Sequence, residues 1–191
     1  ASSGVTFGTG SRTTLTPEDC EALLRECPAV RNAAPVVWAR TQVVYGNRNW
    51  VPPTMLGTTY AFLDVRDWTN LDEGEPFSDR DVLNANKVCL LGKTLAQELF
   101  QGESPIGKEI RIKNVLFRVV GVLSPKGANM MGSDQDDILL APWTTIKYRV
   151  TDVVGNATSL RWGNVRIDNT PPTSSVNATA SYVNTATINI S

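Results

Sequence analysis

The chain has 191 residues with 18 basic and 19 acidic side chains, and this near-neutral balance gives no electrostatic reason to expect nucleic acid or an anionic membrane surface as a partner. It contains no histidine, which removes the commonest general base, the commonest zinc ligand and every Ser-His or Cys-His nucleophile. No stretch approaches 18 consecutive apolar residues, so we expect no membrane-spanning segment within this sequence.

The three cysteines are Cys20, Cys27 and Cys89, which are too few for an all-thiolate zinc site and form no C-x-x-C pair. Cys20 and Cys27 lie about 10 Å apart along a predicted helix, too far for a disulfide. A bridge from either one to Cys89 stays open. The sequence therefore leaves the thiol or disulfide state, and with it the redox compartment, undecided.

Residues 1–15 are small, polar and rich in glycine, which predicts a flexible lead-in without the apolar area to order itself. The next segment, "LTPEDCEALLREC", predicts a helix with Thr16 as N-cap and Pro17 at its first position. Acidic residues follow in the first turn, and Pro28 ends the helix.

Short elements follow in the middle of the chain. Residues 33–59 predict two strands around the turn "GNRN", and residues 60–68 predict a short helix or helical turn. Ser78 lies three residues before Asp81, which indicates a helix cap. The apolar run at 87–92, bounded by Gly92, predicts a buried strand.

The clearest local pattern is a hairpin over residues 109–123, with alternating apolar residues around a turn at Lys113 and Asn114. A helix over residues 93–101 precedes it. The remaining predictions before the tail are a mobile loop, a buried strand and the start of a helix, at 124–137, 137–143 and 144–149.

These elements predict an α+β fold over residues 16–150, with a mixed β-sheet and two or three short helices packed on it. The tail, residues 151–191, differs in composition because it lacks lysine and glutamate and is rich in Ser, Thr and Asn. Its pattern of strand, proline-marked linker and strand predicts a β-rich or irregular appendage.

The segment "GESPIGKE", Gly102 to Glu109, matches the phosphate-binding pattern G-x-x-x-x-G-K-[ST] until its last residue, where Glu109 replaces the hydroxyl that would hold magnesium. A phosphate-binding loop must follow a strand and open a helix, whereas this segment follows a helix and precedes a strand. We therefore expect a Gly-Pro-Gly turn, in which Lys108 binds no phosphate.

Acidic clusters invite a metal interpretation but do not fit one. Asp134, Asp136 and Asp137 lack the glycine and the distal glutamate of a calcium loop, so we expect solvated loop acids. A second acidic group complements the dipole of the first helix without needing chemistry, and it consists of Glu18, Asp19 and Glu21.

Two further groups have residue types that occur in binding sites. Asp64, Asp67 and Asp72 with Trp68 resemble half of a sugar site, although we expect isolated acids and a packed indole. Met130 and Met131 suit either an adaptable apolar contact or a disordered loop tip. The sequence accordingly predicts no catalytic, cofactor-binding or metal-binding residue.

Eight pieces of the sequence, in order, resemble the extracytoplasmic domain of MacB-type ABC transporter permeases over residues 5–150. They are "LTPEDCEALL", "VRNAAPVV", "VVYGN", "FSDRDV", "KVCLLGKTLAQELF", "SPIGKEIRI", "FRVVGVLSPKG" and "DDILLAPWTT". No single piece is diagnostic, but eight in order with similar spacing are specific.

The resemblance implies a non-catalytic, cofactor-free domain inserted between the first two transmembrane helices of a permease and projecting to the periplasmic side. It implies a homodimer in the intact transporter, which reaches the membrane only through segments outside this sequence. It also implies contact with a periplasmic adaptor and, through it, an outer-membrane channel in Gram-negative cells. ATP would be hydrolysed by a separate cytoplasmic domain, and the transported substrate is not identified.

The tail resembles instead the joint between bacterial Ig-like repeats. This supports an alternative from another class, a secreted or surface adhesion module, which would carry further repeats and an anchor. A nucleotide- or sugar-acting enzyme, based on Lys108 or Trp68, is the third interpretation and the weakest.

Overall fold

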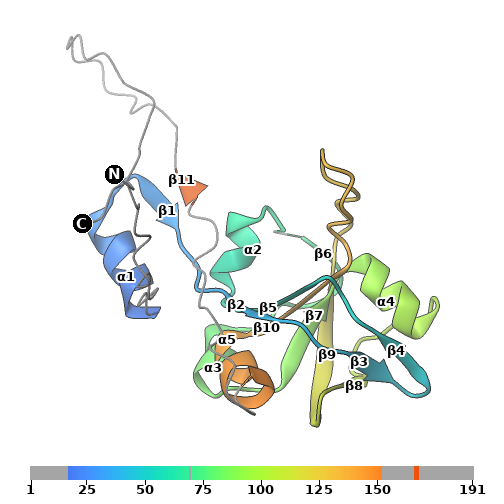
Figure 1. Ribbon diagram of the computed structural model, residues 1–191. Helices are drawn as coiled ribbons and strands as arrows, with labels where there is room; N and C mark the ends of the chain where they lie inside the picture. Colours follow the sequence, from blue (N-terminus) through green and yellow to red (C-terminus); the bar gives the residue numbers. More distant parts are fainter. Residues whose placement is uncertain (1–16, 69, 152–165, 168–191) are drawn as a thin grey trace, which may run out of the picture.

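The structure is a computed structural model that describes residues 17–68, 70–151 and 166–167. A mixed sheet of nine strands lies at its centre (Figure 1), in the order β2-β5-β10-β7-β9-β8-β3-β4, with β6 paired to β9 beside this path. The strands are β2 (Val37–Ala39), β3 (Val43–Tyr45), β4 (Arg48–Trp50), β5 (Thr54–Thr58), β6 (Leu71–Gly74), β7 (Val88–Leu91), β8 (Glu109–Ile112), β9 (Val115–Leu123) and β10 (Ile138–Pro142).

The pairing is parallel between β5 and β10 and between β7 and β9, and antiparallel elsewhere in this sheet. Parallel neighbours require a crossover, which between β7 and β9 is supplied by α4 and β8. The helices are α1 (Pro17–Glu26), α2 (Ala61–Val65), α3 (Asp79–Leu83), α4 (Lys93–Phe100), α5 (Trp143–Thr145) and the π-helix η1 (Ile146–Thr151).

The two faces of the sheet are buried under different helices, which is why every residue of β7 and β10 is buried. Cys89 and Leu91 of β7 join the hydrophobic layer under α4 and η1. Val88 and Leu90 join the layer under α2 and α3, which also contains Trp68. Strands buried on both faces appear as continuous apolar runs, as the sequence at 87–92 predicted.

Local signals explain how the helices and hairpins begin and end. Ser78 and Asp81 form a reciprocal capping box at the start of α3, so that prediction is confirmed. The hairpin β8–β9 turns at Lys113, whose φ of 54° places it in the left-handed region. A second hairpin is formed by β3 and β4. Its Arg48 side chain donates a hydrogen bond to the Leu99 carbonyl at 3.0 Å and so holds β4 against the last turn of α4.

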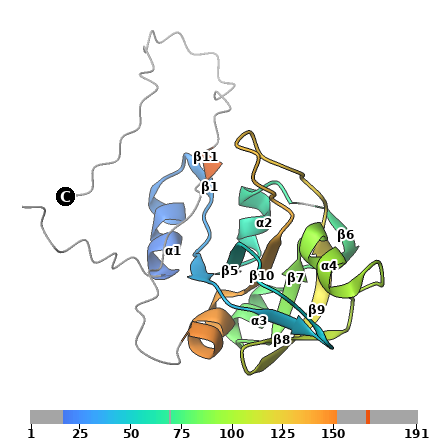
Figure 2. The same ribbon diagram turned by 45° about the vertical axis from the view of Figure 1, so that its right-hand side comes forward.

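A second, smaller sheet lies beside the main one. It pairs β1 (Val30–Asn32) with β11 (Arg166–Ile167) in antiparallel orientation. Figures 1 and 2 show this pair and α1 together on one side of the main sheet, next to α2. Residues from the beginning and the tail of the chain therefore meet in one lobe.

The α+β class and the mixed sheet are confirmed. Two details differ from the sequence-based expectation. Residues 33–59 hold four short strands rather than two, because the chain leaves the sheet at 40–42 and again at 51–53. The described residues hold six helical segments rather than two or three, since α2, α3 and α5 are single turns of three to five residues. The lead-in, Thr16 and the tail apart from β11 lie outside the described residues.

Candidate functional site

A loop between β9 and β10 projects from one end of the sheet, and we call residues 126–135 the finger (Figure 1). Asp136 joins the two sides of its base, because its carboxylate accepts the backbone N–H groups of Lys126 at 2.7 Å and Gly127 at 2.8 Å. The Gln135 N–H donates to the Gly127 carbonyl at 3.1 Å. These bonds connect the start of the loop to its end, and the mobility that the sequence predicts for this loop stays a prediction.

The tip of the finger is closed by Asn129. Its Oδ1 accepts the N–H of Met131 at 2.9 Å and of Ser133 at 3.0 Å, while its own N–H donates to the Ser133 carbonyl. Asn and Gly are the residues that favour such turns, and Gly132 here has a φ of +78°. The tip is thus a built turn on a hydrogen-bonded stem.

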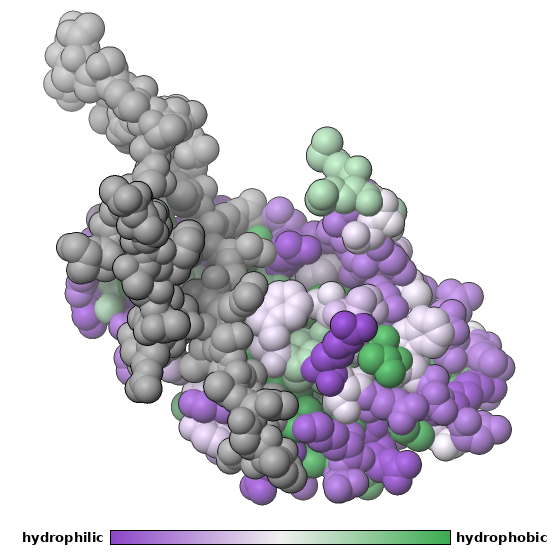
Figure 3. Space-filling view, in the orientation of Figure 1, coloured by the Kyte–Doolittle hydropathy of each residue, from purple (hydrophilic) through white to green (hydrophobic). Residues whose placement is uncertain are grey.

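Two methionines occupy this turn with their side chains in solvent. Met130 is 105% exposed and Met131 is 91% exposed, more than any other large apolar side chain in the described residues. Figure 3 shows apolar atoms at the end of the projection, set off from the polar surface around its base. A pair of exposed, unbranched apolar side chains on an ordered turn is suited to contact rather than to chemistry.

The stem is tied to the body of the domain on two sides. On the α4 side, Thr94 Oγ1 donates to Asp134 at 2.7 Å. On the α2 side, the Lys126 ammonium lies 4.7 Å from the centre of the Trp68 ring and donates to the Arg66 carbonyl. Burial and the neighbouring Arg66 lower the pKa of Lys126.

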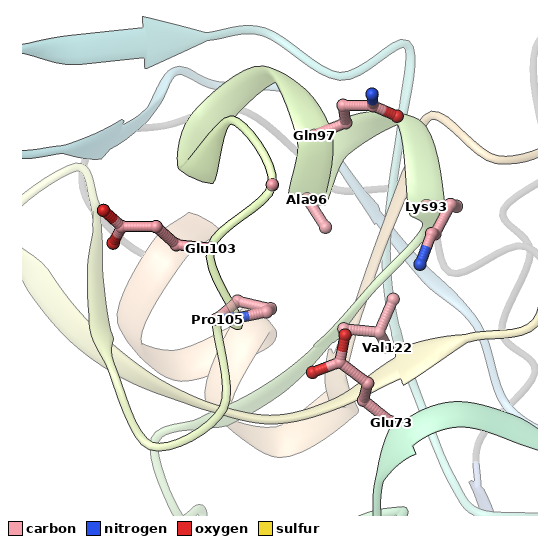
Figure 4. Close-up of a pocket in the computed structure, with 8 residues that line it drawn as sticks. Glu73, Lys93, Ala96, Gln97, Glu103, Pro105 and Val122 are labelled. Carbon is pink, nitrogen blue, oxygen red and sulfur yellow. The ribbon is translucent and has the colours of Figure 1, made fainter.

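A hollow of about 160 Å³ lies beside α4 and the turn that follows it (Figure 4). Half of its lining residues are polar or charged and half are apolar or glycine. Among the polar ones, Lys93 pairs with Asp72, and Glu73 accepts a hydrogen bond from Ser104 Oγ at 2.6 Å. The lining residues are Glu73, Lys93, Ala96, Gln97, Gly102, Glu103, Pro105 and Val122. The hollow therefore offers both charged groups and apolar surface.

The segment that resembles a phosphate-binding loop is the turn between α4 and β8. Lys108 pairs with Glu103 at 2.6 Å, and this hydrogen bond raises the pKa of the ammonium. No helix follows the segment, so the row of free N–H groups that would cradle a phosphate is missing. The expectation of a turn between a helix and a hairpin is confirmed.

The sugar-site interpretation is wrong because Trp68 is 1% exposed and its indole N–H donates to the Ser124 carbonyl at 3.1 Å. Asp64 accepts from Asn32, Asp72 pairs with Lys93, and Asp67 lies at a left-handed backbone position. Asp64 and Asp72 therefore have separate structural partners, and the buried face of Trp68 is not available to stack a sugar.

The acids at the finger also act separately. Asp136 and Asp134 bind the stem, as described above, and Asp137 accepts the indole N–H of Trp50 at 3.0 Å. Burial raises the pKa of Asp137, against the effect of this hydrogen bond. Asp136 and Asp137 are buried rather than solvated, which corrects the sequence-based expectation. Across residues 17–68, 70–151 and 166–167, no three His, Cys, Asp or Glu side chains gather as a metal site would require.

All three cysteines are free thiols, which answers the question that the sequence left open. Cys20 is buried on α1, where burial and the neighbouring carboxylates of Asp19 and Glu21 raise its pKa to about 12. Burial also raises the pKa of Cys89 in the sheet. Glu18, Asp19 and Glu21 lie in the first half of α1, where acids complement the helix dipole.

Solved structures share this fold. The periplasmic region of MacB from Actinobacillus actinomycetemcomitans superposes with a TM-score of 0.65 at 24% identity, covering 83% of this chain and 68% of that one. The extracellular domain of the noncanonic ABC-type transporter YknZ from Gram-positive bacteria gives 0.63 at 20% identity, covering 81% and 73%. Both likenesses show a shared fold.

The chain belongs to the family of MacB-like periplasmic core domains, whose model matches residues 2–186. It is 68% identical over 151 residues to the macrolide export ATP-binding/permease protein MacB of Syntrophobacter fumaroxidans. It is 50% identical over 141 residues to the protein of the same name in Rhodopirellula baltica. These matches cover 79% and 74% of this chain but only 21% of each relative, so the chain spans about a fifth of their length.

The resemblance inferred from the eight sequence pieces is thus confirmed. The part of the chain that the structure describes contains no helix long and apolar enough to cross a membrane. Sequence reasoning singled out Met130 and Met131 but missed the residues that hold them, Asn129 and Asp136. The available signal was an Asn and two glycines, Gly127 and Gly132, bracketing an uncharged stretch.

Proposed function

We propose that the chain is the extracytoplasmic domain of an ABC-type export permease, without catalysis of its own, which transmits ATP-driven motion and contacts partner proteins. The family match over residues 2–186 carries this proposal. Relatives with 68% and 50% identity are named as ATP-binding/permease proteins, and this chain corresponds to about a fifth of each.

The construction of the domain supports a mechanical role. Strands β7 and β10 are buried along their whole length, and helices cover both faces of the sheet. Close packing of this kind moves as a unit instead of deforming continuously. Displacement of one end of the sheet would therefore be carried to the finger at the other end.

In this proposal the parent protein works as a homodimer in the cytoplasmic membrane, with this domain on the periplasmic side. Its partners are a periplasmic adaptor and, in Gram-negative cells, an outer-membrane channel reached through that adaptor. Because the relatives are named as macrolide exporters, macrolides are the first substrates to test. Nucleic acid and cofactors have no place in this function.

The absence of catalysis is tested with the 191-residue chain and a fluorescent ATP analogue with Mg²⁺. We expect no saturable binding and no phosphate release from ATP, and the variant Lys108→Ala should behave like the wild type, because Lys108 is held by Glu103. Saturable binding that Lys108→Ala removes would contradict the proposal and would revive the phosphate-loop interpretation.

The transport role is tested in cells that carry the parent gene together with a gene for a periplasmic adaptor. Cells expressing both should accumulate less of a labelled macrolide than cells in which the Walker lysine of the cytoplasmic ATP-binding domain is replaced by alanine. Equal accumulation would remove macrolides as the substrate. The adhesion alternative rests on the tail, and the family match reaches residue 186 and so covers most of it.

A further inference from the structure

We propose that Met130 and Met131 form a site of reversible oxidative modification, at which peroxides from solution convert both thioethers to sulfoxides while the third methionine, Met55, is spared. This inference goes beyond the proposed function and does not depend on it. It starts from exposure, because Met130 and Met131 are 105% and 91% exposed, whereas Met55 is fully buried.

The three cysteines and three methionines of the chain differ widely in their access to solvent. Cys20 and Cys89 are buried, and burial raises the pKa of both thiols, so they form little of the thiolate that oxidants attack. Cys27 is partly buried. A thioether has no proton to lose before it reacts, so access to solvent decides its reactivity. The two finger methionines are therefore the most accessible sulfur atoms of the protein.

The reaction is a two-electron oxygen transfer. A lone pair of the methionine sulfur attacks one peroxide oxygen, and the S–O bond forms as the O–O bond breaks. The other peroxide oxygen leaves as water after taking up the proton of the transferred oxygen. The sulfur is oxidised by two electrons and the peroxide is reduced by the same two. Neither methionine acts as a catalyst, since the protein supplies only a sulfur atom that the oxidant can reach.

The finger tolerates this change because its hydrogen bonds do not use the thioethers. The tip is closed by the Asn129 side chain, which accepts the backbone N–H groups of Met131 and Ser133. The base is closed by the carboxylate of Asp136. A sulfoxide oxygen on either exposed side chain is solvated by water, so it has no desolvation penalty and displaces none of these bonds.

Met55 shows what the same reaction would do in the core. It lies on β5 between Leu139 of β10 and Ala39 of β2, in the hydrophobic layer that also contains Leu91. A sulfoxide there would place a polar group among apolar side chains and disrupt their packing. Peroxide reaches this sulfur mainly when the sheet opens, and opened states of a folded domain are rare. The fold therefore makes the oxidation selective.

Oxidation changes the chemical character of the finger tip. Residues 127–133 read "GANMMGS" and carry no charge, so the two thioether side chains are the largest apolar groups of the tip. A sulfoxide converts such a side chain into a polar one, and reductases specific for each sulfoxide epimer restore the thioether. The finger thus has an apolar and a polar state that interconvert while the domain stays folded.

The test exposes the native 191-residue chain to millimolar hydrogen peroxide at neutral pH and follows each site by tryptic peptide mass spectrometry. Trypsin places Met130 and Met131 in peptide 127–147, Met55 in peptide 49–66 and Cys27 in peptide 26–31, so the sites are measured separately. Sulfoxide should form at least about tenfold faster in peptide 127–147 than in peptide 49–66. In urea the methionines should react at rates within about twofold of one another, because unfolding removes the difference in exposure.

The matched variant Met130→Leu/Met131→Leu keeps the apolar surface but removes both thioethers. Its peptide 127–147 should gain no oxygen, while the reaction of Met55 should stay unchanged. The oxidised wild type should keep its circular dichroism spectrum and urea midpoint, and the two sulfoxide reductases with dithiothreitol as reductant should return the original masses.

Three results would overturn the inference. The first is oxidation of Met55 in the native chain as fast as that of the finger methionines. The second is a peptide 127–147 that resists peroxide until urea is added, since its thioethers would then be protected in the folded chain. The third is loss of the native spectrum when only the finger methionines are oxidised, which would show that the fold depends on their thioethers.

Discussion

The carboxylate of Asp136 accepts the backbone N–H of Lys126 at 2.7 Å and so joins the end of the finger to its beginning. This bond converts a ten-residue excursion from the sheet into a stem of fixed direction. Met130 and Met131, the most exposed large apolar side chains of the described residues, lie in the turn at the end of this stem.

Replacing Asp136 by alanine should loosen the finger while leaving the domain folded. Two backbone N–H groups lose their acceptor, and leaving such groups unsatisfied costs about 1–3 kcal/mol of stability. Hydrogen exchange should accelerate at residues 126–135 and remain unchanged in β7 and β10. The control is Glu109→Ala, at an exposed position of β8, which should change hydrogen exchange neither in the finger nor in β7 and β10. Unchanged exchange in the finger would contradict the role given to Asp136.

Replacing Leu99 by alanine tests the layer between α4 and the sheet. Leu99 is fully buried there, so its truncation should lower the free energy of unfolding by about 2–5 kcal/mol through lost burial and a cavity. Leu116→Ala, on the exposed side of β9, should change it by less than about 0.5 kcal/mol. Urea denaturation followed by circular dichroism measures both, and equal effects would contradict the layer assignment.

Asp137 should make stability depend on pH. Burial raises its pKa in the folded state, so between the ordinary aspartate range near 4 and this raised value the folded state holds the proton that the unfolded state has released. The contribution of Asp137 to stability therefore falls as pH rises through that window. Asp137→Asn keeps an acceptor for Trp50 but does not titrate.

Urea denaturation at pH 4, 5, 6 and 7 measures this contribution. The difference in unfolding free energy between Asp137→Asn and the wild type should move in favour of the variant as pH increases. Leu116→Ala, at an exposed position of β9 and without a titratable group, should show no such trend. A difference for Asp137→Asn that stays constant across this range would show that the carboxyl titrates normally in the fold.

The cysteines should react at different rates with a thiol reagent at pH 8. Cys27 is half-buried and should react promptly, whereas Cys89 is fully buried, and Cys20 is buried with a pKa of about 12 and yields little thiolate. One thiol should therefore be titrated in the native chain and three in urea. Cys27→Ser should remove the prompt reaction, and a fast reaction that survives this change would contradict the burial of Cys20.

Much of the fold follows from local sequence patterns. Ser78 and Asp81 signal a helix start that depends on neighbouring residues alone, and Lys113 marks a turn between alternating apolar runs. Local patterns do not predict the order of the strands in the sheet or the long-range hydrogen bonds. Such a bond joins residues that are distant in sequence, as Arg48 and Leu99 are. Propensity contains no information on which distant backbone group a side chain will reach.

The candidate site was only half predictable for the same reason. Exposed methionines in a glycine-rich stretch suggested a contact, but their order depends on Asp136 facing Lys126 and Gly127 across the loop. The acidic run at Asp134, Asp136 and Asp137 suggested solvated charges, although each carboxylate has a separate hydrogen-bond partner. Composition identified the residue types, whereas the pairing of the loop's two sides determined what they do.

The central claim is that this domain is the outer part of an ABC-type export permease, and sequencing the parent gene on both sides of these 191 residues tests it most directly. The account predicts apolar stretches of about 20 residues flanking the domain and a true phosphate-binding loop in the same or the neighbouring gene. Repeated Ig-like segments with a surface anchor, and no such stretches, would contradict it.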